Sequence, residues 1–406
     1  LYYFSKNKKA VLNQKSAKMP KDWVISENQA PNFSKNGKQL YFGVAPKPIA
    51  KDTALIANDH AILDVWSYKD DYLKTIQLKK QQAAERAQKE KARQEEILKQ
   101  KAIALQRTGK LGTFPSHLGA EAVGIGVGLA MRPEDVYVPY YRDMPTLYVR
   151  GVPMEQNLQY WGGDERGSVF YKADGELSED LPICVPIATQ ITHAAGIAAA
   201  FKLRNQPRVA VVTIGDGGTS KGDFLEGLNC AGVWHLPMVM IINNNQWAIS
   251  VPRKLQSSAP TLAQKGIGAG VRSLQVDGND VVAVFDATRT AVERARSGKG
   301  PTLIEAVSYR LGDHTTADDA TRYRDGAEVE AAWAREPVKR LRQFMFERDW
   351  WDEQQEQALL AEAGREVERA VAAYEAITPQ APETLLDDKG RRILWSRSEE
   401  RRVGKE

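Results

Sequence analysis

Cysteine is scarce in this chain of 406 residues, and long apolar runs are missing from it. The two cysteines, Cys184 and Cys230, lie far apart and outside any metal-binding or redox spacing, so the sequence gives no disulfide framework and no zinc site. No window approaches the ~20 apolar residues of a membrane-spanning helix, and the N-terminus lacks a signal-peptide pattern. We therefore expect no membrane association and a cytoplasmic location.

An excess of charge of one sign is also absent. The 56 basic and 52 acidic residues give a net charge of +4, and no basic stripe is interleaved with aromatic residues, so we expect no nucleic-acid partner. Hydrophobic residues make up 42% of the chain, enough for the core of one large α/β domain or of two ordinary domains.

The composition changes sharply along the chain. Residues 1–78 are rich in Lys, Asn and aromatics, and a turn at Asn36-Gly37 precedes an apolar strand from Gln39 to Phe42, which predicts a β-hairpin. Residues from about 20 to 78 resemble a propeller fragment of prolyl-oligopeptidase-type serine peptidases, with a further strand expected at Asp64–Lys69. One or two blades cannot close a propeller, and the Gly-x-Ser-x-Gly nucleophile motif is missing, so we do not expect peptidase activity.

Two further segments differ from the centre of the chain. Residues 79–101 carry interspersed acids and bases at helical spacing, which predicts an exposed linker helix or, as the alternative, a partner-binding helix. Residues 387–406 form a short basic tail without apolar periodicity and are expected to be disordered. We interpret residues 1–78 and 387–406 as foreign to the central domain at 102–386.

The central domain contains a strand, turn, helix and strand in succession. A β-branched run from Arg208 to Ile214 leads into the Gly-rich turn Gly215–Ser220, a helical pattern follows from Asp223 to Trp234, and a second apolar run, Pro237–Ile242, ends at three asparagines. In such a unit ligands bind at the carboxyl ends of the strands.

The residues at these two strand ends suit a metal-bound diphosphate. Gly215 and Gly217 permit a tight turn and close approach of the backbone, and Asp216 offers a carboxylate oxygen. Asn245 offers an amide oxygen from the end of the next strand, and the Trp247 carbonyl can complete an oxygen set of the kind that Mg²⁺ prefers. A Gly-Asp-Gly tripeptide alone usually forms only a turn, so the prediction depends on its pairing with the asparagines.

This pairing resembles the signature of thiamine-diphosphate enzymes. Further motifs extend the resemblance, in order, to the α subunits of the first component of the pyruvate dehydrogenase complex: Lys110–Ala122, Tyr140–Asp143, Ile187–Gln190, Gly215–Ser220, Asn243–Ser250 and Tyr309–Asp319. The match covers about 285 residues, from about Ala102 to Leu386. It implies the thiamine-diphosphate-binding α/β fold, a parallel sheet flanked by helices, here with a non-matching N-terminal β fragment and linker helix. The family begins with a helix that has an apolar face, and the charged run stands in its place.

The resemblance assigns a role to each matching position. Tyr141 and Arg142 correspond to residues that contact the diphosphate, as do the backbones of Gly217 and Gly218. Val185 and Ile187 stand where the family packs the thiazolium and faces the pyrimidine. Asp216, Asn245 and the Trp247 carbonyl correspond to the Mg²⁺ ligands, and Arg310 and His314 lie on a loop that closes over the cofactor. His314 is the expected acid or base, whereas His117, His193 and His235 are expected to be structural. Gln246 replaces an arginine of some relatives, so a charge contact from this position is not expected.

The implied enzyme is a pyruvate dehydrogenase (acetyl-transferring) that acts only with a β subunit. The β subunit supplies the glutamate beside the pyrimidine in an α₂β₂ assembly, and the acyl group passes to the lipoyl domain of a dihydrolipoyl acyltransferase. The shared motifs leave open a branched-chain 2-oxoacid dehydrogenase or an acetoin dehydrogenase α subunit. A non-functional chimera is the remaining alternative.

Overall fold

The structure, a computed structural model, describes residues 97–98, 100–172, 174–378 and 380, together with the backbone of six short strands between Tyr2 and Pro46. The chain divides into two units, Leu1–Asp71 and Tyr72–Glu406. Each unit is considered by itself below.

The first unit contains three antiparallel strand pairs. They are β1 (Tyr2–Ser5) with β2 (Lys8–Val11), β3 (Trp23–Ile25) with β6 (Val44–Pro46), and β4 (Asn32–Phe33) with β5 (Leu40–Tyr41). The pairing of β4 with β5 confirms the predicted hairpin around Asn36-Gly37. The strand expected at Asp64–Lys69 lies outside the described residues, and the likeness to a propeller blade stays a prediction.

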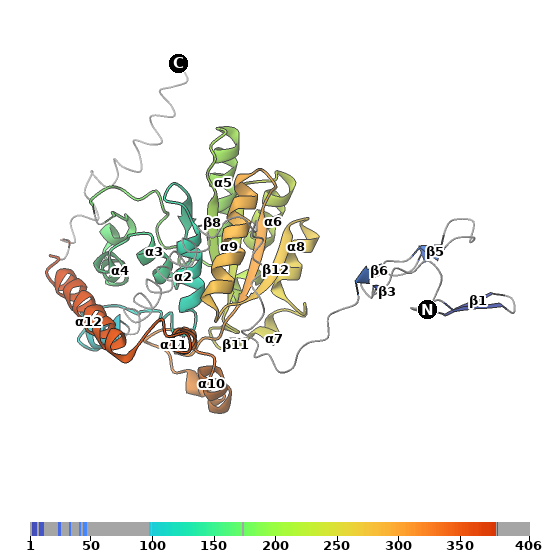
Figure 1. Ribbon diagram of the computed structural model, residues 1–406. Helices are drawn as coiled ribbons and strands as arrows, with labels where there is room; N and C mark the ends of the chain where they lie inside the picture. The colour runs from blue at the N-terminus through green and yellow to red at the C-terminus, as the bar shows by residue number, and fades with distance from the viewer. Residues whose placement is uncertain are drawn as a thin grey trace, which may run out of the picture. The chain divides into compact units, whose positions relative to one another are not determined.

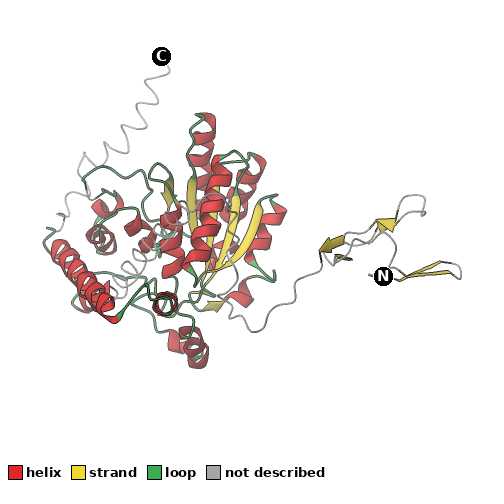
Figure 2. Ribbon diagram, viewed as in Figure 1, coloured by secondary structure: helices red, strands yellow, loops and turns green. Residues whose placement is uncertain are grey.

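The second unit is built on a five-stranded sheet in which all neighbours are parallel. The order is β12-β13-β9-β8-β7 (Figure 1), and helices lie on both sides of the sheet (Figure 2). The strands are β7 (Val136–Val138), β8 (Ala210–Gly215), β9 (Met238–Asn244), β12 (Arg272–Asp277) and β13 (Thr302–Val307). This arrangement confirms the predicted α/β class and the predicted strand, helix and strand from Arg208 to Ile242.

Two helical layers bury the two faces of the sheet. Side chains of a strand alternate between its faces. Val212 of β8 and Met240 of β9 therefore point to the side of α5 (Thr189–Leu203) and α6 (Gly222–Val233). The next residues of these strands face α2 (Glu121–Ala130) and α9 (Val281–Arg296). Burial on both faces explains why these strands read as continuous apolar runs.

The remaining helices surround this sheet core. They are α3 (Met144–Val149), α4 (Met154–Trp161), α7 (Arg253–Gln256), α8 (Lys265–Gly268), α10 (Gly326–Trp333), α11 (Pro337–Phe346) and α12 (Glu353–Glu375). Short 3-10 helices span Glu165–Ser168, Asp216–Ser220, Leu262–Gln264 and Ala320–Arg322, and a small hairpin joins β10 (Trp247–Ala248) to β11 (Val251–Pro252). Acidic N-caps begin several helices, among them Asp280 at α9 and Asp352 with Gln355 in a capping box at α12.

A helix before residue 108 packs into the second unit. Residues 97–98 and 100–107 are helical, and Leu98, Ala102 and Leu105 are buried in a cluster with Val367 of α12. Their spacing by four and three residues forms one apolar face. The prediction of an exposed helix up to residue 101 is therefore wrong at its C-terminal end, where Leu98 belongs to the core. Residues 79–96 lie outside the described residues.

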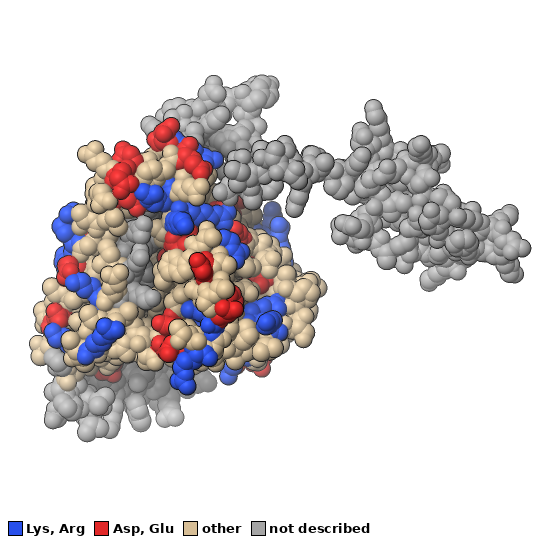
Figure 3. Space-filling view, turned by 90° about the horizontal axis from the view of Figure 1, so that it is seen from below, with Lys and Arg blue, Asp and Glu red and all other residues tan. Residues whose placement is uncertain are grey.

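Charges of both signs are mixed over the face of the molecule seen in Figure 3. None of the described helices combines the length and apolarity that a bilayer crossing requires.

Candidate functional site

The predicted site residues gather where the strands of the sheet end. Asp216 follows β8 directly, Asn245 follows β9, and Arg310 comes three residues after β13 ends at Val307. In a parallel sheet these carboxyl ends share one edge. In Figure 1 this edge faces β11, α7 and α11 at the bottom of the view.

Asp216 is a buried carboxylate at the start of the turn after β8. It is 3% exposed, and its Oδ2 atom accepts a hydrogen bond of 3.2 Å from Nε2 of Gln256 in α7. Burial raises the pKa of Asp216 to about 6, because the charged form loses hydration, and the Gln256 hydrogen bond opposes this shift. A divalent cation beside the carboxylate would restore the charged form.

The three asparagines at the end of β9 do different work. Asn244 donates from Nδ2 to Glu305 of β13 at 2.7 Å, and Asn243 accepts from the Ser308 hydroxyl at 2.9 Å. Only Asn245 turns to the site edge, where its Oδ1 atom accepts from the Trp247 amide at 3.1 Å. The first two residues thus fasten β9 to the end of β13, and the third remains for a ligand.

Two glycines of the turn after β8 are required by packing. A Cβ atom at Gly217 would lie 2.6 Å from Cβ of Ala248, and one at Gly218 would lie 2.5 Å from Cγ1 of Ile214. Both distances are shorter than any ordinary contact. The turn therefore excludes side chains at these positions.

Arg142, Arg310 and His314 form a cluster of potential cations. The Nη2 atom of Arg142 lies 3.1 Å from Nδ1 of His314 and donates to its carbonyl at 2.9 Å. The Nη1 atom of Arg310 lies 3.4 Å from the same ring nitrogen. Burial first, then Arg142 and Arg310, lower the pKa of His314 to about 4. The ring is therefore neutral at neutral pH, and its Nδ1 atom accepts hydrogen bonds from the two guanidinium groups.

Arg310 also reaches the proposed metal ligand. Its guanidinium is buried, and it donates to the carbonyls of Trp247 at 3.4 Å and Ile249 at 2.8 Å. Burial lowers the pKa of Arg310, and Arg142 lowers it further. Its Nε atom has no hydrogen-bond partner among the described residues. Buried donors of this kind are satisfied in most proteins, so an anion fits here.

Tyr141 completes the cluster, while Val185 and Ile187 stand apart from it. The Tyr141 ring lies 6.1 Å from the His314 ring, and the Arg142 guanidinium lies over it at 5.4 Å. Val185 and Ile187 are 48% and 42% exposed in the segment before α5. Ala188, which ends this segment, has a φ of 73°. The two apolar side chains therefore offer an open surface.

Several residues of the site were not predicted. Gln256, which contacts Asp216, gives no signal in the sequence, because it lies 40 positions away in a short helix. Asp318 accepts from the His314 amide at 2.8 Å and from the Tyr323 hydroxyl, which also contacts Arg310. The position of Asp318 four residues after His314, in the polar run Asp313-His-Thr-Thr-Ala-Asp-Asp319, is the signal that could have shown it. Gln246 donates from Nε2 to the Asn244 carbonyl at 3.3 Å.

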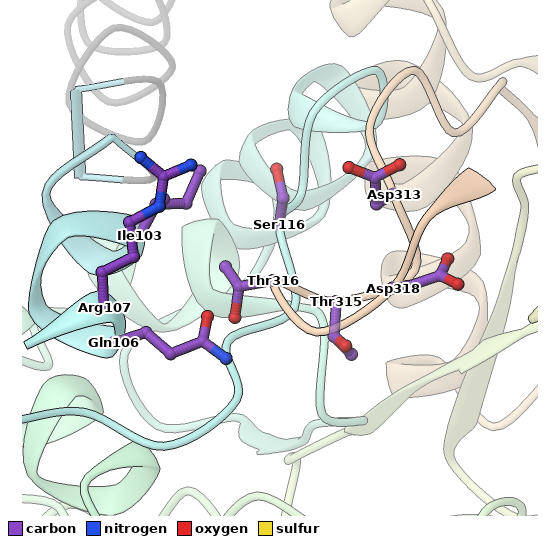
Figure 4. Close-up of a pocket in the computed structure, with 8 residues that line it drawn as sticks. All are labelled: Ile103, Gln106, Arg107, Ser116, Asp313, Thr315, Thr316 and Asp318. Atoms are coloured by element: carbon purple, nitrogen blue, oxygen red, sulfur yellow. The ribbon is translucent and has the colours of Figure 1, made fainter. Parts of the chain in front are cut away.

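A cavity of about 420 Å³ borders the His314 loop (Figure 4). It is lined by Ile103, Gln106, Arg107, Ser116, Asp313, Thr315, Thr316 and Asp318. Thr316 is fixed at its wall, since its hydroxyl accepts from the Phe114 amide at 2.9 Å. The cavity thus lies between this loop and the helix at 100–107, and none of the predicted site residues lines it.

The described residues contain no group of three or more His, Cys, Asp or Glu side chains that could hold a metal ion. A metal at this edge would need the mixed set of one carboxylate, one amide and one backbone carbonyl.

Comparison with known proteins identifies the family. The model of the family "Dehydrogenase E1 component" matches residues 89–383. A protein of Acholeplasma laidlawii is 43% identical over 268 residues, which cover 66% of this chain and 76% of that protein. One of Mycoplasma pneumoniae is 41% identical over 289 residues (71% and 79%), and one of Staphylococcus aureus is 39% identical over 293 residues (72% and 78%). Each of the three is named pyruvate dehydrogenase E1 component subunit alpha. The chain belongs to the dehydrogenase E1 component family.

Proposed function

We propose that this chain is the α subunit of a pyruvate dehydrogenase E1 component. The enzyme decarboxylates pyruvate oxidatively with thiamine diphosphate and transfers the acyl group to a lipoyl group. The names of the relatives at 38–43% identity support the substrate. One observation of the structure carries the proposal: Asp216, Asn245, Arg142, Arg310 and His314 meet at one edge of the sheet.

The cation cluster fits a diphosphate. Burial and Arg142 lower the pKa of both Arg310 and His314, and Asp318 opposes this shift only in part. An anion between the guanidinium groups would act against the shift. Arg142 would give a forked, charge-assisted contact to phosphate oxygens. Tyr141 and the backbones of Gly217 and Gly218 would complete the phosphate contacts.

Mg²⁺ fits the oxygen atoms beside this cluster. Asp216 would supply a carboxylate oxygen, Asn245 its Oδ1 atom and Trp247 its backbone carbonyl, a set that suits a hard cation. The raised pKa of Asp216 supports this assignment, because the loss of hydration on burial exceeds the opposing effects of Gln256, two backbone amides and Arg310. The diphosphate would supply further oxygen ligands.

The protein binds, orients and handles protons, and bound thiamine diphosphate supplies the carbon nucleophile and electron sink for decarboxylation. Val185 and Ile187 would pack against the thiazolium ring with their exposed apolar side chains. His314 is neutral at neutral pH. Its ring nitrogen would accept a proton near the reacting atoms and later return it. Anion binding beside it would raise its pKa toward the range useful for general acid–base catalysis.

The proposal includes a β subunit. This chain offers no carboxylate assigned to the pyrimidine side of the cofactor, and the open surface at Val185 and Ile187 would be covered by the partner in an α₂β₂ assembly. The lipoyl domain of a dihydrolipoyl acyltransferase would enter beside the His314 loop. We further propose a cytoplasmic location, no nucleic-acid or membrane partner, and foreign segments at 1–78 and 387–406 on either side of the dehydrogenase domain, which includes the helical residues 97–98 and 100–107.

Reconstitution tests the function. The full chain, purified with the β subunit encoded beside it, is assayed for acyl transfer to a lipoyl domain with pyruvate, branched 2-oxoacids and acetoin at equal concentrations. We expect the largest kcat/KM for pyruvate. A larger kcat/KM for a branched 2-oxoacid or for acetoin would show that the proposed substrate is wrong, while the proposed cofactor site would still stand. A folded complex that is inactive with all three would favour the non-functional chimera.

A further inference from the structure

His117 makes two short contacts that a neutral imidazole cannot both satisfy. It is 1% exposed, and its Nδ1 atom lies 2.5 Å from the Arg142 carbonyl oxygen while its Nε2 atom lies 2.7 Å from the Ala120 carbonyl oxygen. A neutral ring has one N–H donor and one acceptor nitrogen. One contact would then set two lone pairs against each other. Both are hydrogen bonds only when the ring carries two protons.

A counter-charge lies beside this ring. The Oδ1 atom of Asp143 is 3.8 Å from Nε2 of His117, and both side chains are fully buried. This oxygen has no hydrogen-bond partner among the described residues. Burial lowers the pKa of His117 below its ordinary value, and the Arg142 charge adds to this, while Asp143 and then the two carbonyl groups act against the shift and favour the charged ring. Paired buried charges cost far less than isolated ones.

The fold reserves the space for this pair. A Cβ atom at Gly124 of α2 would lie 3.3 Å from Nε2 of His117 and 3.4 Å from Oδ1 of Asp143. A side chain at this helical position would crowd Cβ of Pro145 at 3.1 Å and the His117 ring, and it would reach contact with Asp143. Gly124, which is unfavourable within a helix, is explained by this close approach.

The pair lies between the two halves of the candidate site. On one side, the other Asp143 oxygen accepts from the Tyr137 hydroxyl, which lies 2.7 Å from the Thr213 hydroxyl in β8, three positions before Asp216. On the other side, His117 holds the backbone of Arg142, whose guanidinium contacts His314. Side-chain contacts therefore run from the strand of Asp216 to His314.

We propose that doubly protonated His117, paired with Asp143, is a positioning residue for Arg142. It fixes the Arg142 carbonyl and so the direction in which the guanidinium leaves the backbone. Asp143 and Arg142 are the charged groups that face the ring; Glu121 of α2 accepts from the Gly119 amide, and Tyr137 faces Asp143. The inference rests on the proposed function only in taking Arg142 as a diphosphate contact.

The protonation state can be seen directly. The chain has five histidines, so ¹⁵N-histidine labelling and magic-angle-spinning NMR of the αβ complex resolve a small set of ring nitrogens, and His117→Asn assigns the one of interest. At pH 6 we expect both His117 nitrogens to be protonated. A ring with one unprotonated nitrogen at pH 6 would overturn the proposal.

Two variants of His117 separate its contacts with the Arg142 and Ala120 carbonyls. The side-chain amide nitrogen of Asn takes the position of Nδ1, which contacts Arg142, and that of Gln takes the position of Nε2, which contacts Ala120. His117→Gln loses the donor to the Arg142 carbonyl and should weaken thiamine diphosphate binding by about tenfold at pH 6, the scale of one hydrogen bond to a charged group. The loss should shrink at pH 8, where fewer wild-type rings carry two protons. His117→Asn should stay within about threefold of wild type at both pH values, since it keeps a neutral donor on this side.

Calorimetry of the complex with Mg²⁺ and thiamine diphosphate measures these affinities, with His193→Gln, on an exposed histidine of α5, as the matched control. Equal affinity of His117→Gln and wild type at pH 6, or an equal loss in the Asn and Gln variants, would overturn the positioning role. The Asp216→Ala variant separates the two failures: if it too binds normally, the proposed cofactor site is wrong, and if it alone loses binding, only the role of His117 is wrong.

Discussion

The two edges of the sheet treat buried charge in opposite ways. At the amino edge, Arg296 donates to Asp135 at 2.8 Å and Arg150 donates to Asp180 at 2.6 Å, and all four side chains are nearly inaccessible. At the carboxyl edge, Arg142 and Arg310 converge on His314. Burial lowers the pKa of both Arg296 and Arg310, but Asp135 outweighs it and raises the pKa of Arg296, whereas Arg142 adds to it at Arg310.

We infer from this difference that the charged groups of the amino edge stabilise the fold, whereas those of the carboxyl edge serve ligand binding. The carboxylates of the amino edge also hold the starts of strands, since Asp135 accepts from the Val209 amide at 2.9 Å and Asp180 from the Tyr137 amide at 2.8 Å. Both oxygens of each carboxylate accept hydrogen bonds from the chain, although the Nε atom of Arg296 has no partner among the described residues. The carboxyl edge keeps unmet donors and a carboxylate of raised pKa, which is costly unless a ligand arrives. Five experiments test this contrast, in order of decreasing expected effect.

The largest effect is expected for Asp216→Ala. It should abolish Mg²⁺-dependent thiamine diphosphate binding, weakening it by more than ~100-fold, because loss of a mere outer-shell partner already costs roughly 10- to 100-fold at metal sites. The fold should persist, since no amino-edge contact changes. Calorimetry of the αβ complex measures it, with Asp174→Ala on the surface as control; unchanged affinity would move the metal elsewhere.

His314→Ala should bind the cofactor and lose the overall reaction. Turnover with saturating lipoyl acceptor should fall by roughly 10²- to 10⁴-fold, the usual contribution of a general acid or base. Steady-state assays and calorimetry of one preparation separate the two properties. Near-normal turnover would reduce His314 to a structural residue of its loop.

Asp135→Asn should act on stability alone. It leaves the buried Arg296 guanidinium without its charge partner, and breaking a buried pair costs roughly 3–5 kcal/mol of unfolding free energy. Asp286→Asn, in an exposed pair with Arg289, should cost less than ~1 kcal/mol. Urea unfolding measures both. If Asp135→Asn unfolds like wild type but binds the cofactor poorly, the assignment of stability to the amino edge and of binding to the carboxyl edge is wrong.

The cofactor-free protein should show two opposing pH effects between about pH 4 and 6. His314, with its pKa lowered to about 4, binds fewer protons folded than unfolded, so its contribution to stability falls as the pH drops below 6.5. Asp216, with its pKa raised to about 6, binds more protons folded, so its contribution falls as the pH rises through 6. His314→Gln and Asp216→Asn should therefore shift the pH dependence of the thermal midpoint in opposite directions. Shifts of the same sign would contradict the assigned protonation states.

The smallest effect is expected from trimming. Deleting residues 1–78 and 387–406 should leave cofactor affinity unchanged, because no residue of either edge lies in them. We compare the full and trimmed chains by soluble yield, by thermal midpoint with and without thiamine diphosphate, and by activity with the β subunit. Loss of the cofactor-induced stabilisation would make the N-terminal segment an integral part of the protein.

The local hydrophobic pattern of the sequence predicted the strands that carry the candidate site, but it did not predict the long-range contacts. The run from Arg208 to Ile242 gave β8, α6 and β9 within about two residues at each boundary, because burial on both faces leaves an apolar signature. The burial of Leu98 was missed because the charges around it dominate the composition. The contacts of Gln256 with Asp216 and of His117 with Arg142 depend on tertiary approach, which periodicity does not report.

The asparagine run at the end of β9 has a consequence for how variation in this chain would be interpreted. Asn243 and Asn244 hold β9 to the end of β13, and Glu305 accepts from both Asn244 and the Ala263 amide. Asn245 follows them directly and carries the proposed metal contact. In a mutational scan, changes at 243 and 244 should reduce cellular abundance, whereas changes at 245 should leave abundance normal and remove activity. The three asparagines would thus serve the fold at two positions and the proposed metal site at the third.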